Sequence, residues 1–279
     1  MARAICRPPA FHLAAFAYTE GMRALGIMYH DVVENGDFSS SGFPGEGADV
    51  YKLRREDFER HLDAVRAEAA AVSTVGSLEG RPVLLTFDDG GVSFHHPIAR
   101  LLEERGWRGH FFITTDRIGT PGFLSEAQLR ELHERGHVIG SHSCSHPTRM
   151  AALTRAELDR EWRQSVARLS QILGSKVTTA SVPGGYYSRE VGESAAAAGI
   201  ETLFTSEPTS QVSMLNGCRV IGRYVVQRGM APEWSGGFAA GRAARCLRQA
   251  VLWKAKRIAK SLGGARYLQL RQAILEKRR

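Results

Sequence analysis

The sequence predicts an α/β protein built around a parallel sheet, and three observations support that prediction. From residue 23 onward, short apolar runs of strand character alternate with amphipathic stretches of helical periodicity. Capping boxes mark two of the helix starts, at Ser125 with Gln128 and at Thr154 with Glu157. Hydrophobic residues make up 43% of the 279 residues, which is enough for a sizeable core. Repeated βα units imply a parallel sheet, closed or open, and their number suits a barrel.

The expected elements follow from this alternation in chain order. Helices are expected where apolar residues recur three or four apart, as Phe58, Leu62 and Val65 do. Residues 33–50 are rich in Gly, Ser and acids, and they predict a long loop over one face that is a candidate lid. The expected strands are Arg23–Tyr29, Val83–Phe87, His110–Thr114, Val138–Ser141, Val177–Val182, Glu201–Thr205 and Val220–Val226. The expected helices are Arg55–Ala70, Pro97–Arg105, Ser125–Arg135, Thr154–Leu173 and Glu190–Ala198.

The net charge of +8 is concentrated at the end of the chain. Residues 239–279 contain twelve Lys and Arg but one acid, whereas residues 1–238 carry 25 bases and 28 acids. We therefore divide the chain into an N-terminal segment (1–22), a barrel (23–238) and a basic helical tail (239–279). The four cysteines lie far apart with no CxxC pair, which argues against a disulfide framework and against a thiolate zinc site.

Targeting signals are weak in this sequence. It has no run of about 18 apolar residues, so a spanning helix is not expected. The stretch Phe11–Tyr18 imitates a signal peptide only faintly, because it is short, contains His12 and lacks a convincing cleavage site. We expect a cytoplasmic protein, with peripheral association at the inner face of the membrane as a further option.

Polar side chains follow four of the predicted strands directly. Because the carboxyl ends of parallel strands meet at one ligand-binding rim, we expect these side chains to lie close together. They are His30 and Asp31, Asp88 and Asp89, His142 and His146, and the stretch Pro183–Tyr187.

The spacing within two of these pairs favours a metal centre. His142 and His146 are four residues apart, so in a helical turn both imidazoles can bind one metal ion. The adjacent Asp88 and Asp89 repel each other unless a cation lies between them, and a metal on one leaves the other as a base for water. Alone, an Asp-Asp pair is usually a solvated turn and an HxxxH pair is usually structural, but their joint position at strand ends favours function.

Three stretches resemble the motifs of the polysaccharide deacetylase family, carbohydrate esterase family four. They are MYHDV (Met28–Val32), TFDDG (Thr86–Gly90) and HSCSH (His142–His146). The likeness extends from about Ala24 to Arg223. It implies a distorted (β/α) barrel of about seven strands, followed here by the basic helical extension.

The resemblance also implies a chemistry. Members remove N-acetyl groups from amino sugars with one divalent metal, commonly zinc, while cobalt, nickel and iron suit the same donor atoms. By position, Asp88 corresponds to the general base, and Asp89, His142 and His146 correspond to the metal ligands.

The chain departs from the family pattern in its third motif. In SVPGGYY, Ser181 stands where the family has an arginine that steadies the base. The Pro-Gly-Gly still suits backbone N–H groups that approach an oxyanion. Gly184, Tyr186 and Tyr187 are therefore candidates for oxyanion or substrate binding. Arg223 is a further candidate, because it occupies a plausible inward position in the last expected strand.

The family's C-terminal histidine, which supplies a proton to the departing amine, is also missing. His146 is the last histidine in the chain. Candidate replacements are His30, His95, His96, or Asp88 returning the proton that it took. We favour Asp88 as the proton shuttle, with His30 in support.

The basic tail predicts an amphipathic helix over residues 242–262. Leu247, Val251, Ala255, Ile258 and Leu262 share one face, with Lys and Arg on the others. Such a helix can lie on an anionic membrane or cap the barrel, and we slightly favour the cap. Nucleic acid is not expected, because no recognition motif accompanies the charge.

The leading prediction is a metal-dependent N-deacetylase of an N-acetylated saccharide, either a polysaccharide or a lipid-linked saccharide at the cell envelope. Two alternatives stay open. One is hydrolysis of a non-sugar amide, and the other is a catalytically inactive carbohydrate-binding domain. Retention of both Asp88 and Asp89 counts against the inactive domain, since binding alone needs no free base.

Overall fold

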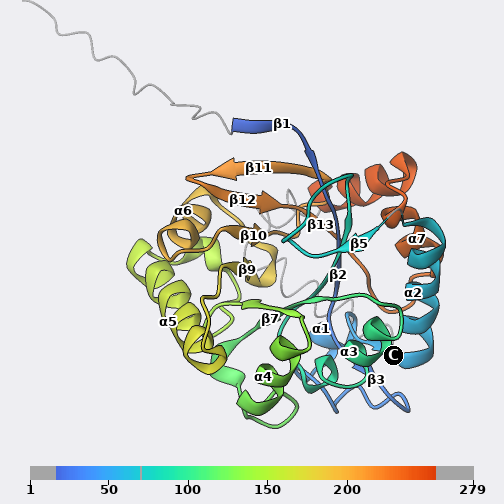
Figure 1. The fold of residues 1–279 in the computed structure, drawn as a ribbon, viewed down its shortest axis with the longest axis horizontal. Helices are drawn as coiled ribbons and strands as arrows, with labels where there is room; N and C mark the ends of the chain where they lie inside the picture. The colour runs from blue at the N-terminus through green and yellow to red at the C-terminus, as the bar shows by residue number, and fades with distance from the viewer. Residues whose placement is uncertain (1–16, 70, 256–279) are drawn as a thin grey trace, which may run out of the picture.

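A computed structural model describes residues 17–69 and 71–255 of the chain. Its centre is a curled sheet, with most helices packed around the outside (Figure 1). The strands are β1 Ala17–Arg23, β2 Leu25–Tyr29, β3 Val32–Val33, β4 Leu53–Arg54, β5 Val72–Ser73, β6 Val83–Phe87, β7 His110–Ile113, β8 Val138–Ser141, β9 Thr179–Ser181, β10 Thr202–Phe204, β11 Gln211–Leu215, β12 Cys218–Ile221 and β13 Arg223–Val225. The α-helices are α1 Glu46–Asp49, α2 Arg55–Glu68, α3 Ile98–Glu103, α4 Glu126–Glu134, α5 Arg155–Leu173, α6 Arg189–Ala197 and α7 Glu233–Ala239, and residues 243–255 are helical as well.

The main sheet runs in the order β1-β11-β12-β10-β9-β8-β7-β6-β2-β13, with β5 paired to β6. The strands β12 and β13 are consecutive and are separated by Gly222 alone. Because β12 pairs in parallel with β10 and β13 pairs in parallel with β2, this one segment bridges β10 and β2 and closes the ring of parallel strands. The expected distorted barrel of about seven strands is therefore confirmed, with β12–β13 as the seventh strand position.

Glycine is required at the bend between β12 and β13. A Cβ atom at Gly222 would lie 2.2 Å from the carbonyl oxygen of Glu207 and 2.6 Å from the Thr209 side chain. Any larger residue would push this segment away from the loop that follows β10. The closure of the barrel therefore depends on a position with no side chain.

The strand β6 shows how the barrel separates its two apolar layers. Val83, Leu85 and Phe87 pack outward into the main core against the helices. Leu84 belongs to a second cluster, with residues such as Phe112 of β7, and this cluster fills the barrel interior. Since side chains alternate along a strand, Thr86 and the residue after Phe87 continue the inward-facing set.

The helix starts agree with the predicted capping signals. Ser125 and Gln128 form a capping box at the start of α4. Thr154 and Glu157 form the corresponding box at the start of α5, which ends at Gly174 in the left-handed conformation. Both predicted N-termini are confirmed to within one residue.

Besides the short β3, β4, β5 and α1, three longer elements were not expected from the sequence. The strands β1 and β11 form an antiparallel edge, and α7 precedes the predicted basic helix. Within the described residues, the loop 33–50 contains one short helix, α1, and otherwise remains a loop. None of the helices in 17–69 and 71–255 is long and apolar enough to cross a bilayer.

Some sequence predictions fall outside these residues, namely those for Cys6, the first part of Phe11–Tyr18, and the helix beyond residue 255 with Ile258 and Leu262. The other three cysteines, Cys144, Cys218 and Cys246, are free, as expected.

Candidate active site

Asp88 follows β6 directly, and its buried carboxylate pairs with Arg223 of β13. Arg223 Nη1 donates to Asp88 Oδ1 at 2.7 Å, and Nη2 donates to Oδ2 at 2.8 Å. The same guanidinium donates to the carbonyl oxygen of Thr205 at 3.0 Å and to the hydroxyl of Thr86 at 3.2 Å. Arg223 is 1% exposed, so solvent does not screen the pair. The two parallel hydrogen bonds fix the orientation of the carboxylate.

The pair keeps Asp88 charged despite its burial. Burial alone raises the pKa of Asp88, but the charge of Arg223 and then the charge of His142 outweigh it, so the pKa lies below its ordinary value. The sequence placed Arg223 in the site but gave it no partner. The structure shows that barrel closure brings it to Asp88, beside Ser181, where the resemblance had led us to expect an arginine.

Asp89, His142 and His146 form a second group beside Asp88. Asp89 Oδ1 lies 3.4 Å from His142 Nε2 and 3.4 Å from His146 Nε2. The three potential ligand atoms all lie within 4.8 Å of one another. Asp89 (φ +87°) and His146 (φ +58°) both adopt the left-handed conformation, a strained state that clusters at functional sites.

The polar contacts of the second imidazole nitrogen orient His142. Ser181 Oγ donates to Asp88 Oδ1 at 3.1 Å, and it lies 2.6 Å from His142 Nδ1, which can donate to it. With Nδ1 as the donor, the Nε2 lone pair would be available to a metal ion bound beside Asp89. A histidine whose outer nitrogen is held in this way is typical of metal ligands. The donor set therefore fits a divalent metal ion of the zinc type.

Glu161 of α5 holds the loop between the two histidines. Its carboxylate accepts hydrogen bonds from the backbone N–H groups of Cys144 and Ser145, both at 2.9 Å, and from the Ser145 hydroxyl at 2.8 Å. Sequence reasoning missed this residue. The available signal was an acid next to Trp162 on the face of α5 that faces the core.

The charges within the cluster stabilise one another in the metal-free state. Burial raises the pKa of Asp89, but hydrogen bonds from His142 and His146 more than offset this, and the pKa lies well below its ordinary value. Burial lowers the pKa of His146, but the hydrogen bond to Asp89 outweighs it and raises the pKa overall. A metal ion bound to the three side chains would replace these attractions.

His30 follows β2 and lies in the same pocket. Its ring packs on Tyr51 with centroids 4.6 Å apart, and its buried Nδ1 has no hydrogen-bond partner among the described residues. Burial lowers the pKa of His30, although the charges of Asp89 and Asp88 act in the opposite direction. Of the candidate proton donors, His30 is thus the histidine that faces the acid pair.

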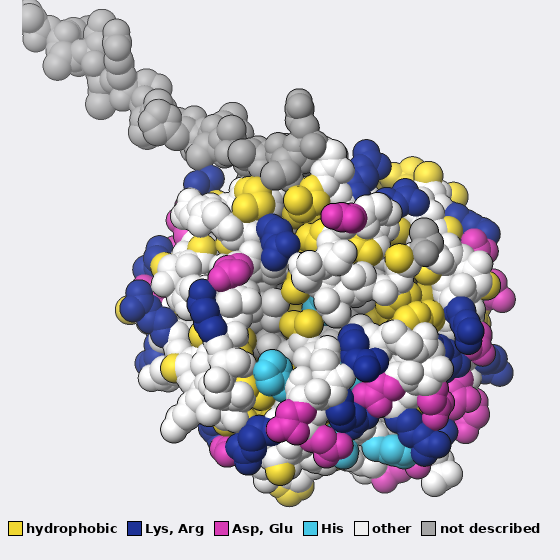
Figure 2. All heavy atoms as spheres, in the orientation of Figure 1, with side chains coloured by type: hydrophobic (Ala, Val, Ile, Leu, Met, Phe, Trp, Pro, Cys, Tyr) yellow, Lys and Arg dark blue, Asp and Glu magenta, His cyan; other side chains and the backbone are white. Residues whose placement is uncertain are grey.

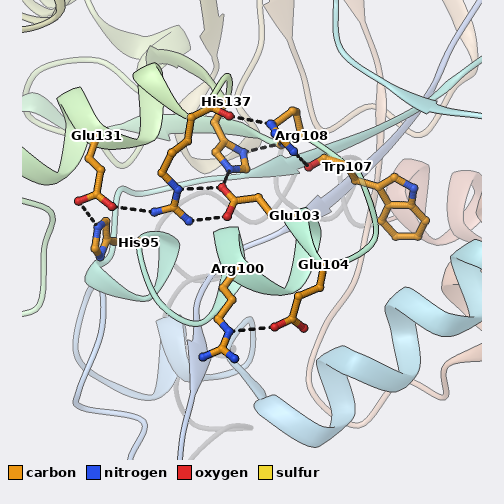
Figure 3. Close-up of polar contacts among 10 residues, drawn as sticks. His95, Arg100, Glu103, Glu104, Trp107, Arg108, Glu131 and His137 are labelled. Carbon is orange, nitrogen blue, oxygen red and sulfur yellow. Dashed lines mark hydrogen bonds and ion pairs between the residues drawn. The ribbon is translucent and has the colours of Figure 1, made fainter.

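The other two candidate histidines lie elsewhere. His95 Nε2 is 2.9 Å from the carboxylate of Glu131 on α4, in a surface network that continues through Arg135 to Glu103 and His137 (Figure 3). Neither His95 nor the exposed His96 lines the pocket. The proposal that either could serve as the acid is therefore wrong.

The site opens into a pocket of about 560 Å³ at the carboxyl ends of the strands. Its lining includes the predicted base Asp88, the three potential metal ligands and His30, together with Gly184, Tyr186, Tyr187 and Arg223. Gly184 has φ +63°, and a Cβ atom there would lie 3.0 Å from the carbonyl oxygen of Thr148. Aromatic residues from other segments complete the walls, including Phe43 and Tyr51 from the region of the predicted lid.

A further buried acid, Asp31, holds the loop 33–50 beside the site. Asp31 Oδ1 accepts hydrogen bonds from Ser41 Oγ at 2.6 Å and from Ser93 Oγ at 2.8 Å. The carboxylate fits against two residues without side chains, since a Cβ atom at Gly91 or at Gly42 would lie 1.8 Å or 2.0 Å from it. Burial raises the pKa of Asp31 to about 6, with the Ser41 hydrogen bond acting against the rise.

Fold and site together define a barrel protein with a buried acid and a candidate metal centre at the carboxyl ends of its strands. Residues 76–203 match the family model for polysaccharide deacetylases, so this segment belongs to that family and the resemblance is confirmed. The Bacillus subtilis (strain 168) protein YxkH, whose name assigns it to the polysaccharide deacetylases, is 28% identical over 222 residues, which cover 76% of this chain and 74% of that protein.

Solved structures show the same fold. The Streptococcus pyogenes deacetylase PplD in complex with acetate superposes with a TM-score of 0.62 at 19% identity, covering 76% of this chain and 95% of that chain. IcaB from Ammonifex degensii superposes with a TM-score of 0.63 at 21% identity, covering 79% and 98% of the two chains.

Proposed function

We propose that the protein is a metal-dependent hydrolase that removes the acetyl group from an N-acetylated amino sugar in a polysaccharide or lipid-linked saccharide. The observation that carries the proposal is the pairing of a buried, charged Asp88 with a neighbouring three-ligand cluster inside the family segment. A binding domain would need neither the free carboxylate nor the guanidinium that keeps it charged. Asp88 as a free base beside Asp89 as a metal ligand is an arrangement that favours catalysis.

The cluster would hold one divalent metal ion, which supplies an activated water and polarises the acetamide carbonyl. Zinc suits the two imidazoles and one carboxylate best, and cobalt, nickel and iron suit them too. Asp88 accepts the proton of the attacking water. Because Arg223 holds both of its oxygens and Ser181 links it to His142, the base has a fixed direction relative to the ligands.

The departing amine must receive a proton, and two groups can deliver it. Asp88 can return the proton it has taken, or His30 can donate from Nδ1. We favour Asp88 as the proton shuttle, with His30 in support, because the charges of both acids act on the His30 ring and its Nδ1 has no other described partner. The backbone at Gly184 and the rings of Tyr186 and Tyr187 are assigned to the oxyanion and to the walls around the sugar.

Metal content and acetate release, measured on the same preparations, test this proposal. Wild type should carry about one equivalent of metal and should release acetate from N-acetylated saccharides. Asp88→Asn should keep the metal and lose the activity, whereas His142→Ala should lose both. Metal without acetate release would favour a non-sugar amide or a binding role, and a wild type without affinity for metal would refute the metal centre.

We also propose that the basic tail binds anionic membranes. The helix 243–255 carries all three large hydrophobic side chains that are exposed in the described residues, Leu247 (64%), Val251 (56%) and Leu252 (52%). Yellow and dark blue side chains lie together at the upper right of Figure 2, where Figure 1 places the end of the described chain. The helix packs on the barrel through another face, which includes Cys246. Leu247 and Val251, the described large residues of the predicted apolar stripe, are therefore exposed and accessible to a lipid surface.

Flotation with vesicles tests the membrane proposal. Wild type should float with vesicles that contain phosphatidylglycerol and should remain below with phosphatidylcholine alone. Leu247→Glu/Val251→Glu should lose the binding. Equal flotation of this variant, or none by wild type, would contradict the proposal.

A further inference from the structure

The C-terminal helix is fastened to the strand that carries Arg223. The Gln249 side chain accepts a hydrogen bond from the backbone N–H of Val225 and donates one to the Val225 carbonyl oxygen, both at 2.9 Å. One turn earlier, Cys246 packs on the main core, close to Tyr224. Tyr224 and Val225 directly follow Arg223 in β13, and Arg223 binds Asp88. The contacts of the helix with these two residues therefore hold it at a fixed position relative to Asp88.

The same helix face reaches the catalytic pocket. Trp253 lies one helical turn after Gln249, so the two side chains share a face. Trp253 lines the pocket that also contains Asp88 and the two histidines. It is partly buried there, whereas its helix neighbours Leu252 and Lys254 are exposed. A residue 50 positions beyond the family segment thus contributes a wall to the candidate active site.

The chemistry of the lining indicates what this wall contacts. Besides Trp253, the pocket is lined by the aromatic rings of Phe43, Tyr51 and Tyr186, and the last of these is backed by the guanidinium of Arg149 at 5.3 Å. Such a combination of aromatic rings and a few charged groups suits a ligand that is apolar on its faces and polar at its edges. A pyranose ring has this character, because its C–H groups lie on its faces and its hydroxyls lie at its rim.

We infer that Trp253 binds the saccharide by packing on the face of a sugar ring, so that the C-terminal helix is part of the active site. This inference rests on the proposed function. We assign Trp253 to substrate binding and not to the bond-breaking step, because an indole neither takes up nor releases a proton in this reaction. Its loss should raise KM about tenfold while kcat changes by less than about twofold.

The test uses the full chain with its metal and chito-oligosaccharides of two to five units. Acetate release is measured for wild type, Trp253→Ala and Trp253→Phe, with Ala244→Ser, at an exposed position of the same helix, as the matched control. We expect a higher KM for Trp253→Ala, a smaller rise for Trp253→Phe, and wild-type values for the control. An unchanged KM for Trp253→Ala would overturn the inference.

Tryptophan fluorescence gives a second readout that does not require turnover. Binding of the oligosaccharide should change the emission of wild type and of Asp88→Asn, and Trp253→Phe should lack that change even if Trp253→Ala fails to fold. A saccharide-dependent change without acetate release would support the wall at Trp253 and refute the proposed reaction. If acetate is released and the fluorescence change persists in Trp253→Phe, sugar binding by Trp253 would be refuted while the proposed reaction would stand.

Discussion

Removal of the Arg223 guanidinium tests how the buried acid is kept charged. Arg223→Met retains most of the side-chain length and deletes the two hydrogen bonds to Asp88 together with those to Thr205 and Thr86. Asp88 then remains buried with the Ser181 hydroxyl as its described donor. The cation that offsets its burial is gone.

The expected loss of stability is large and depends on pH with a defined sign. A buried ion that loses its partner destabilises the fold by about 3–5 kcal/mol. In wild type the pKa of Asp88 is depressed in the folded state, so the pair contributes stability above the unfolded pKa, and this is lost as pH falls through the folded pKa. In the variant, burial acts without Arg223 and raises the pKa. The destabilisation should therefore be greatest at neutral pH and should shrink towards pH 4.

Urea unfolding of four proteins measures this effect: wild type, Arg223→Met, Asp88→Asn and the double variant, all at equal metal content. The double variant leaves no unpaired charge, so it should recover at least about 2 kcal/mol of the loss while remaining inactive. Arg223→Lys is the matched control, because it keeps the charge without the bidentate geometry and should lie between the extremes.

The reasoning would be refuted by a loss below about 1 kcal/mol in Arg223→Met at pH 7, or by a double variant no more stable than Arg223→Met. Either result would mean that the guanidinium does not offset the burial of Asp88.

Three further changes act on the surroundings of the site. Glu161→Ala removes the acceptor for the loop between the metal-binding histidines, and zinc affinity, measured by competition with a chelator, should fall about 10- to 100-fold; an unchanged affinity would assign Glu161 to stability alone. Asp31→Asn removes a carboxyl whose folded pKa is raised to about 6 from 3.8. Such a group favours the folded state at low pH and loses that contribution as pH rises through about 6. Wild type should therefore lose roughly 2 kcal/mol relative to the variant between pH 4 and 7 in urea unfolding, and an equal pH dependence of the two proteins would contradict this. Gly91→Ala places a Cβ atom 1.8 Å from Asp31 Oδ1 and should cost about 1–3 kcal/mol of stability, whereas an unaffected midpoint would show that the loop yields freely.

The barrel could be predicted because its inner strands are short apolar runs between clear stops. The strands at Val83–Phe87 and Val138–Ser141 have the expected bounds, and both capping boxes are present. The antiparallel edge was missed for the converse reason. The strand β1 has the sequence AYTEGMR, and β11 is only half buried, so neither carries a strong hydrophobic pattern.

In the site, contacts between residues at the ends of predicted strands could be predicted from the sequence, and contacts that depend on the closed barrel could not. The Asp89, His142 and His146 cluster follows from residues at two strand ends, and the three residues meet as expected. The helical turn expected between the two histidines is wrong, because residues 142–146 form a loop with positive φ at Ser143 and His146. The partner of Asp88 lies 135 residues away and is fixed only when β12–β13 closes the sheet. Glu161 was equally hidden, because its acceptor role depends on how α5 packs under a loop 16 residues earlier in the chain.

The hydrogen bonds of Gln249 have a consequence for solubility. The strand β13 pairs with β2 on one side, and Val225 directs its backbone N–H and C=O to the other. Uncovered, these groups would offer a template on which a strand of another molecule could pair. The Gln249 amide satisfies both groups and thereby blocks that pairing. A chain that ends before the C-terminal helix would lose this protection. It would expose an unpaired strand edge, prone to aggregation, on β13, the strand that carries Arg223.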